Sequence, residues 1–296
     1  MRPLLLLNLI LFSVMSYAQD SARQSESDAR ILSIYHGLAD IPPVATQLFC
    51  DLPPAPNQDG MPVVFSVQVD SETITPNAFA VGLSSGETVT PLCATLRPAE
   101  ESLEQRTVLL IGAFSPDDSV PVSVEIVEQL EDENGLSLLG LKGENVTSLN
   151  AGPSLVLAER FRPSNPGLQG ECPEETEQTV LLTWEGGVTG PRGADLAEEQ
   201  RTAVSVSLQD GNSVNPLLLA DDDPPPGPTD NHIIACIAED SPALSVSVSA
   251  GYFHDPGDDA NPETRIDVTP EINKYCLLYT SPSPRDLSTS RMPSSA

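Results

Sequence analysis

Basic and aromatic residues are scarce in this chain of 296 residues. Lysine and arginine together number 14 against 43 acidic residues, which gives a formal net charge of −29 at pH 7. This charge disfavours binding to nucleic acid and to anionic membrane surfaces, since both are polyanions and would be repelled. Aromatic residues make up only 4%, so a hydrophobic core must be built mainly from Val, Leu, Ile and Ala.

Motifs for metal, nucleotide and membrane chemistry are also missing. No H-E-x-x-H, C-x-x-C or glycine-rich phosphate-binding pattern occurs, and no segment is apolar over 18 residues. Histidine occurs three times, at His36, His232 and His254, each beside an expected strand or turn. We therefore predict a protein without a resident cofactor that is not an enzyme and has no membrane span.

The N-terminus has the three parts of a secretory signal peptide. Met1–Pro3 carries a positive charge, Leu4–Val14 is apolar, and Ser16–Ala18 places small residues before a cleavage site. The apolar stretch is too short to cross about 30 Å of hydrocarbon. We therefore predict that residues 1–18 are a signal peptide. The protein is expected to be secreted and extracellular or at the cell surface, or periplasmic in a Gram-negative host.

The C-terminal segment differs in composition from the acidic chain before it. Cys276–Asp286 and Ser290–Ala296 resemble the two constant parts of a transposase-type sequencing adapter translated in frame. A natural Ser/Pro-rich tail is the alternative. We interpret residues 276–296 as a non-native tail and exclude them from the fold. Without Cys276 the cysteines form an even set: Cys50, Cys93, Cys172 and Cys236.

Apolar residues alternate with polar ones in several short segments, which is the pattern of strands with one buried face. Continuous apolar runs at Val108–Ile111 and Val180–Leu182 are typical of central strands, and the best helical candidate, Ala194–Ala203, is short. Because clusters of Pro, Gly, Asn and Asp separate these segments, we predict an all-β fold of antiparallel sandwiches. The alternating apolar residues are Val63, Phe65, Val67 and Val69; Val122, Val124 and Ile126; Val204, Val206 and Leu208; and Leu244, Val246 and Val248.

The sequence contains an internal repeat. Val81–Leu92 aligns without gaps on Val206–Leu217 with six identities, among them Gly86 with Gly211 and a proline five residues further on. Chance likeness between two β-hairpins is the alternative, but a buried run and an alternating strand follow both copies. We therefore predict two tandem antiparallel β-sandwiches. Their expected bounds are 28–160 and 179–275, joined by a Pro/Gly-rich linker at 161–178.

The cysteines suggest one disulfide bond in each half. Cys50 and Cys172 each lie just before the first alternating or apolar strand of their half. Of the three possible pairings, we therefore favour Cys50–Cys93 with Cys172–Cys236, which keeps both bonds within a sandwich.

Two segments of the first half form a recognisable pattern: Pro62–Asp70, read as a strand ending in Val-Asp, and Thr73–Val81, which matches T-L/I-x-x-x-x-F-x-V. In these segments the first half resembles S-layer-type bacterial Ig-like domains, and the resemblance implies that the two tandem sandwiches are Ig-like. The cysteines and the Pro-rich segment Ile41–Pro62 depart from that family. The resemblance implies structural, adhesive or accessory roles, with no catalytic residues to carry over.

Acidic clusters are the plentiful functional groups of this chain. Ca²⁺ prefers several carboxylate and carbonyl oxygens in a flexible loop, and the segment after His254 offers them in close spacing. A second cluster, Asp221–Asp223, precedes a proline run. Solvated turns capped by Asp and Asn are the alternative for both clusters. The candidate calcium ligands are Asp255, Asp258, Asp259, Asn261 and Glu263.

Two patterns suggest hydrolase chemistry. Gly82–Gly86 matches G-x-S-x-G, but the following residues favour a strand and contain Pro91, whereas a nucleophile elbow requires a helix there. A hairpin turn is the better interpretation. Paired carboxylates could hydrolyse glycosides only in a cleft with aromatic residues, and Trp184 lies on an expected core strand.

We therefore predict a noncatalytic secreted protein with a structural, adhesive or ligand-binding role, whose partner is an extracellular protein or glycan. The alternative is the accessory region of a secreted hydrolase. A carbohydrate-binding module is a third possibility, which exposure of both Tyr252 and Phe253 would favour and burial of both would oppose. Asn145 begins a glycosylation sequon, which has meaning only in a eukaryotic host.

Overall fold

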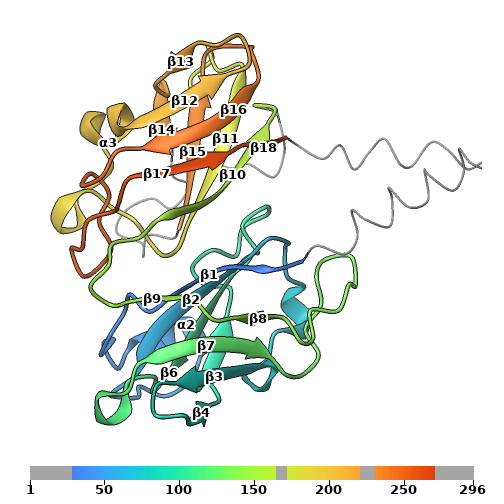
Figure 1. The fold of residues 1–296 in the computed structure, drawn as a ribbon, viewed down its shortest axis with the longest axis vertical. Coiled ribbons are helices and arrows are strands. Elements are labelled where there is room, and N and C mark those ends of the chain that lie inside the picture. Colours follow the sequence, from blue (N-terminus) through green and yellow to red (C-terminus); the bar gives the residue numbers. More distant parts are fainter. Residues whose placement is uncertain (1–28, 165–171, 221–230, 271–296) are drawn as a thin grey trace, which may run out of the picture.

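The computed structural model describes residues 29–164, 172–220 and 231–270 and is all-β, as predicted. It contains two sandwich units, drawn one above the other in Figure 1. The predicted signal peptide, the cluster Asp221–Asp223 and the predicted C-terminal tail lie outside the described residues. In the described part, no helix is long and apolar enough to span a membrane.

The first sandwich consists of a five-stranded and a four-stranded sheet. The first sheet has the order β5-β6-β2-β1-β9 and the second has the order β4-β3-β7-β8. The strands are β1 (Ile31–Tyr35), β2 (Asp59–Phe65), β3 (Phe79–Leu83), β4 (Thr88–Val89), β5 (Cys93–Thr95), β6 (Thr107–Gly112), β7 (Pro121–Ile126), β8 (Lys142–Gly143) and β9 (Val146–Thr147).

The second sandwich repeats this order strand for strand. Its sheets are β14-β15-β11-β10-β18 and β13-β12-β16-β17. The strands are β10 (Leu155–Phe161), β11 (Gln178–Trp184), β12 (Val204–Leu208), β13 (Ser213–Val214), β14 (Leu218–Ala220), β15 (His232–Ile237), β16 (Ala243–Val248), β17 (Thr264–Asp267) and β18 (Thr269–Pro270).

The correspondence between the sandwiches extends to irregular details. β9 pairs in parallel with β1, and β18 pairs in parallel with β10, whereas the other strand pairs are antiparallel. The first strand of each sandwich carries a register shift at its start, between Ile31 and Ser33 and between Leu155 and Leu157. This agreement indicates that the internal repeat is structural and covers the whole sandwich.

The predicted hairpin repeat is confirmed. The turn between β3 and β4 contains Gly86 with φ +87°, and the turn between β12 and β13 contains Gly211 with φ +91°. A backbone with positive φ favours glycine because a side chain would clash there. The shared glycine therefore has a conformational reason.

The predicted boundary between the halves is wrong. β10 (Leu155–Phe161) pairs along its length with β11, so it belongs to the second sandwich, and the chain from 162 to 177 connects two strands within it. The chain passes between the sandwiches at residues 148–154. Proline and glycine correctly indicate a loop, but they do not reveal whether the loop lies between domains or inside one.

Each sandwich has its own hydrophobic core. The first core includes Phe65, Phe79 and Leu110, and the second includes Val206, Val246 and the single tryptophan. The alternating residues Val204, Val206 and Leu208 point into the core as predicted, and the serines between them are partly exposed.

The alternation fails at the start of β7 and of β16. Val122 is 42% exposed and Leu244 is 51% exposed, although both are expected to face the core. A register shift separates Gly82 from Leu83 in the β3–β7 pair, and another occurs at the same place in the β12–β16 pair. A β-bulge reverses which residues face inward, and Pro121 and Ala243 are buried instead.

The central strands are buried on both faces. All residues of β2 and β11 are buried, including Val64, which the alternation places on a polar face. In the first sandwich, the short helix α2 (Ala45–Cys50) contributes to the cover of the outer face. The expected helix at 194–203 is confirmed in a shorter form as α3 (Glu198–Ala203).

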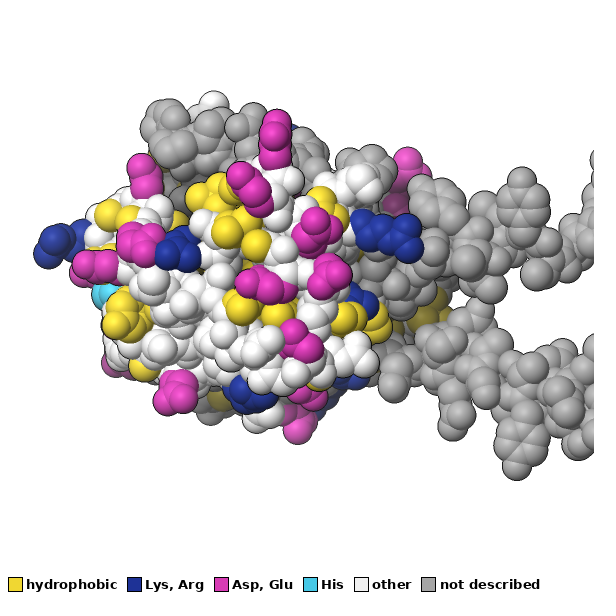
Figure 2. All heavy atoms as spheres, turned by 90° about the horizontal axis from the view of Figure 1, so that it is seen from above, with side chains coloured by type: hydrophobic (Ala, Val, Ile, Leu, Met, Phe, Trp, Pro, Cys, Tyr) yellow, Lys and Arg dark blue, Asp and Glu magenta, His cyan; other side chains and the backbone are white. Residues whose placement is uncertain are grey.

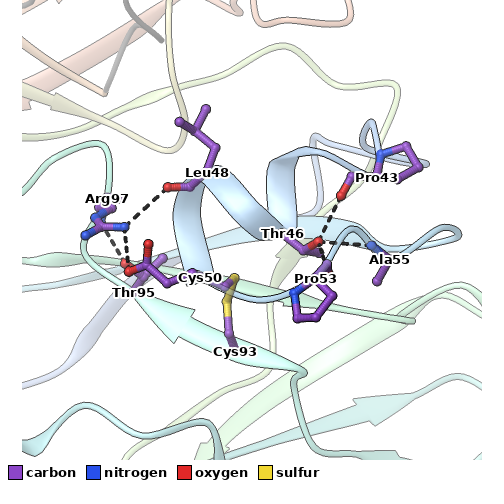
Figure 3. The surroundings of a disulfide bond; sticks show 10 residues. Pro43, Thr46, Leu48, Cys50, Pro53, Ala55, Cys93, Thr95 and Arg97 are labelled. Atoms are coloured by element: carbon purple, nitrogen blue, oxygen red, sulfur yellow. Dashed lines mark hydrogen bonds and ion pairs between the residues drawn. A yellow bond between two sulfur atoms is a disulfide. The ribbon is translucent and has the colours of Figure 1, made fainter.

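Both predicted disulfide bonds are present, Cys50–Cys93 and Cys172–Cys236. Figure 3 shows the first, which connects the end of α2 to β5. Near it, the Thr46 hydroxyl donates to the Pro43 carbonyl oxygen and accepts from the Ala55 N–H. These two bonds connect the residues before α2 to the residues after it.

Candidate functional site

The predicted calcium ligands lie in one loop, but two of them already have structural roles. The Asn261 side-chain oxygen accepts hydrogen bonds from the N–H groups of Tyr252 and Phe253. The Asp255 carboxylate accepts one from the Asp259 N–H at 2.8 Å and one from the Tyr35 hydroxyl at 2.7 Å. Both Asp255 and Asn261 are 2% exposed, so these contacts fix the loop from within.

The other candidate ligands lie nearer the surface. The Asp258 carboxylate accepts from the Arg192 N–H at 2.7 Å and lies 3.0 Å from His254 Nδ1. Glu263 is exposed and Asp259 is partly exposed. Among the described residues, no three His, Cys, Asp or Glu side chains are grouped to hold a metal ion. Calcium binding by this loop stays a prediction.

The loop that contains these residues, 255–263, is called the acidic loop below. It contacts the first sandwich through the hydrogen bond between Asp255 and Tyr35. A Cβ atom at Gly152, in the connection between the sandwiches, would collide with the backbone of Ala260. A Cβ atom at Gly186 would lie 2.6 Å from the Tyr35 ring. Glycine therefore permits a close approach of the connection to the acidic loop at Gly152, and of the two sandwiches to each other at Gly186.

Polar and charged side chains connect the two sandwiches, and we call this contact the joint. Thr147 donates to Glu185 at 2.8 Å, and Asn231 donates to Thr107 at 2.9 Å. Arg106 forms an ion pair with Glu159 at 2.8 Å, and His232 lies 4.0 Å from Glu104. The joint consists of Tyr35, Glu104, Arg106, Thr107, Thr147, Glu159, Glu185, Asn231, His232 and Asp255.

Burial shifts the pKa of several joint residues. Burial and the nearby Asp255 carboxylate raise the pKa of Tyr35 far above its ordinary value. Burial also raises the pKa of Glu185, although hydrogen bonds from Thr147 and Ser154 oppose the effect. Burial and the positive charge of Arg106 hold the pKa of His232 well below its ordinary value. At neutral pH the joint therefore holds a protonated Tyr35 and a neutral His232.

The G-x-S-x-G motif forms a hairpin turn, as interpreted from the sequence. Ser84 lies in the turn after β3, and its hydroxyl accepts a hydrogen bond from the Val120 N–H at 3.1 Å. A strand, β4, follows the turn where a nucleophile elbow requires a helix.

His36 and His254 contact carboxylates that have structural partners. His36 is buried 3.6 Å from Asp59, which also accepts hydrogen bonds from Phe114 and Ser115 in the loop after β6. The partners of Asp59 hold this loop in place. His254 contacts Asp258 within the acidic loop.

The aromatic residues that could bind a sugar differ in their exposure to solvent. Trp184 is fully buried and its ring lies 4.6 Å from that of Phe253, between centroids. Phe253 is also fully buried, whereas Tyr252 is 39% exposed. The predicted core position of the tryptophan is confirmed, and the condition for a carbohydrate-binding module, exposure of both Tyr252 and Phe253, is not met.

A groove of about 470 Å³ opens beside β1 and β8. Its charged lining residues are Lys142 and Glu144, which pair with each other at 2.7 Å. The groove has no histidine or cysteine in its lining.

Figure 2, which looks onto the second sandwich from above, shows acidic side chains spread among neutral ones rather than gathered in one place.

Sequence reasoning missed the joint. Its members are single residues in strands and in the loops between them, and no spacing connects Tyr35 to Asp255 or Arg106 to Glu159. One available signal was an isolated charged residue next to an apolar run, such as Arg106 before β6, because a charge that is buried there needs a partner. That signal identifies a buried charge without identifying its partner.

Comparisons with known proteins give weak similarities. No protein-family model and no curated protein match the chain. The N-terminal part of the bacterial S-layer protein SbsC is similar in structure, with a TM-score of 0.28 and 13% identity, over 86% of this chain and 48% of that one. The S-layer protein rSbsC(31-844) gives a TM-score of 0.30 and 12% identity, over 88% of this chain and 44% of that one. The chain spans less than half the length of either structure.

Proposed function

We propose that this chain is a noncatalytic extracellular protein with a structural or adhesive role, in which two Ig-like sandwiches work as one unit. The observation that carries this proposal is the use of the buried polar groups. Asp255, Asn261, Glu185 and Arg106 hold loops and sandwiches together through hydrogen bonds and an ion pair. In the described residues, the groups that the sequence offers for catalysis make such structural contacts.

The disulfide bonds and the surface charge support an extracellular setting. Disulfide bonds form and persist in oxidising compartments such as the periplasm and the exterior. The excess of acidic residues favours solubility, since like-charged molecules repel one another. The signal peptide predicted at residues 1–18 agrees with this setting.

Binding and turnover measured on the same protein would test the proposal. The purified full chain would be applied to immobilised cell-wall polysaccharide, glycans and extracellular proteins, and incubated with chromogenic esters and glycosides. We expect retention on one surface or self-assembly without turnover. Hydrolysis that survives repurification would contradict the noncatalytic role.

Calcium is a separate prediction for the acidic loop. Binding to the folded state raises the melting temperature by mass action. The melting temperature would be compared in millimolar Ca²⁺ and in EDTA, with Asp259→Asn as the loop variant and Glu72→Gln as an exposed control. A melting temperature that is equal in both solutions would remove calcium from the proposal.

A further inference from the structure

The joint contains a histidine that both sandwiches shield from solvent. His232 is the first residue of β15 and is 2% exposed. Alternate residues of β15 belong to the core of the second sandwich, so His232 lies on the outer face of its sheet. The loop before β6 covers it from the first sandwich and contributes Glu104 and Arg106.

The charged groups around His232 come from two elements, the loop before β6 and β10. Glu104 Oε2 lies 4.0 Å from His232 Nδ1, and Arg106 follows on the same loop. Arg106 also pairs with Glu159 of β10, and the neighbouring residue in the β11–β15 ladder is the uncharged Thr183. A proton added to His232 would therefore place a charge in a buried contact, where burial and Arg106 oppose it more strongly than Glu104 favours it.

Equivalent positions of the two sandwiches meet at the joint. Thr107 and His232 begin β6 and β15. Tyr35 and Glu159 directly follow Ile34 and Ala158, which pair with equivalent residues of β2 and β11. Such reciprocal use of one surface is typical of two-fold contacts between identical subunits. Separation of the sandwiches would expose both sides together, with His232 among the exposed groups.

We propose that the joint is a pH-sensitive contact in which His232 takes up a proton only when the sandwiches separate, so that acidification loosens the joint while each sandwich stays folded.

The direction follows from proton linkage. In the closed joint the pKa of His232 is held well below its ordinary value, whereas in an open joint the imidazole would be solvated and titrate near about 6.5. The open form therefore binds more protons, and the ratio of open to closed molecules rises up to about tenfold per pH unit below about 6.5.

Glu185 acts in the opposite direction. Burial raises the pKa of its carboxyl, so protonation of Glu185 favours the closed joint as pH falls. A comparison of the wild type with a His232 variant isolates the histidine, because Glu185 is present in both proteins.

Hydrogen exchange of the full chain tests the proposal. The Asn231 side-chain amide proton that donates to Thr107 reports the joint, and the N–H groups of β12 report the second sandwich. Protection factors, corrected for intrinsic exchange, would be measured from about pH 7 to about pH 5 for the wild type and His232→Asn. His254→Asn, which removes a histidine outside the joint, is the matched control.

We expect the ratio of Asn231 side-chain amide protection in His232→Asn to that in the wild type to rise up to about tenfold per pH unit below about 6.5. Protection of β12 and the His254→Asn protein should show no such change. A ratio that is constant with pH would overturn the proposal, as would equal losses at the Asn231 amide and β12. If His232→Asn does not fold, NMR of the wild-type imidazole decides. Titration near about pH 6.5 with the Asn231 amide still protected would overturn the proposal, and a neutral ring at about pH 5 would support it.

Discussion

The two sandwiches solve the same structural problems with different residues. Asp59 and Gln178 begin the equivalent strands β2 and β11, and each holds the loop that follows β6 or β15. Asp59 accepts hydrogen bonds from Phe114 and Ser115, whereas Gln178 donates to the carbonyl oxygens of Glu239 and Ser241. The position is fixed by the fold, but only the first sandwich uses an ionisable group there.

The disulfide bonds differ in a similar way. Cys93 of β5 pairs in the ladder with Ile111 of β6, and at the equivalent pair Leu218 lies opposite Cys236. Both bonds therefore attach the segment between the first two strands of a sandwich to the same region of its outer face. The bond is made to β5 in the first sandwich and to β15 in the second. In the second sandwich, Leu103 of the first sandwich also packs on this face. The second sandwich thus depends on its neighbour for part of its cover.

Removal of the large core aromatic residues should give the largest effects. Phe65 and Trp184 end β2 and β11, and both are fully buried. Substitution of either by alanine should cost about 3–5 kcal/mol of unfolding free energy in its own sandwich, since a cavity is left behind. Urea unfolding monitored by circular dichroism would measure this. Tyr252→Ala is the exposed control, and an equal effect of Tyr252→Ala and Trp184→Ala would contradict the assignment.

Loss of a disulfide bond should have the next largest effect. Cys50→Ala with Cys93→Ala opens a loop with a sequence separation of 43, and Cys172→Ala with Cys236→Ala one of 64. Each double variant should lose about 2–4 kcal/mol. The second should also expose Leu103, which proteolysis of the loop before β6 would detect. If the second variant lost only its own stability and left this loop resistant, the dependence of the second sandwich on its neighbour would be wrong.

A fall in pH should weaken the contribution of Asp59 to stability and leave that of Gln178 unchanged. Burial opposes ionisation of Asp59, but contacts with His36, Ser115 and Asp40 outweigh it and hold its pKa below the ordinary value. A lowered pKa means that Asp59 stabilises the first sandwich fully above about pH 4, and that this contribution is lost as pH falls through the folded-state pKa. The second sandwich has no such contribution from Gln178.

Urea unfolding at several pH values would measure this difference. Trp184 fluorescence reports the second sandwich, and hydrogen exchange of β3 reports the first. Asp59→Asn should cost about 1–3 kcal/mol at neutral pH and remove the acid dependence that Asp59 contributes. An unchanged acid dependence in this variant would show that other carboxylates are responsible.

The hairpin glycines should give the smallest effects, and equal ones. No atom lies within 4 Å of a Cβ built on Gly86 or Gly211, so only the positive φ opposes a side chain. Alanine at either position should cost about 1 kcal/mol, measured by the shift in urea midpoint. A much larger cost at one hairpin would mean that the two copies are not equivalent there.

Much of the fold could be predicted from the sequence because strand periodicity and turn chemistry are local. The alternation at Val204–Leu208, the glycine pair Gly86 and Gly211 and both disulfide bonds are confirmed. The error at the boundary has a recognisable cause. Each sandwich has a Pro-rich segment with one cysteine between its first two strands, and this parallel would have identified residues 161–178 as an internal loop.

The sequence by itself determined that the chain forms two similar β-sandwiches with one disulfide bond each, because hydrophobic alternation, a repeated hairpin and cysteine placement act over short distances. Only the tertiary structure decided where β-bulges expose Val122 and Leu244, and which side chains meet across the joint. Contacts such as Tyr35 with Asp255 and Arg106 with Glu159 join residues far apart in the chain. Their pairing depends on how two finished sandwiches fit together, and no local pattern in the sequence encodes that fit.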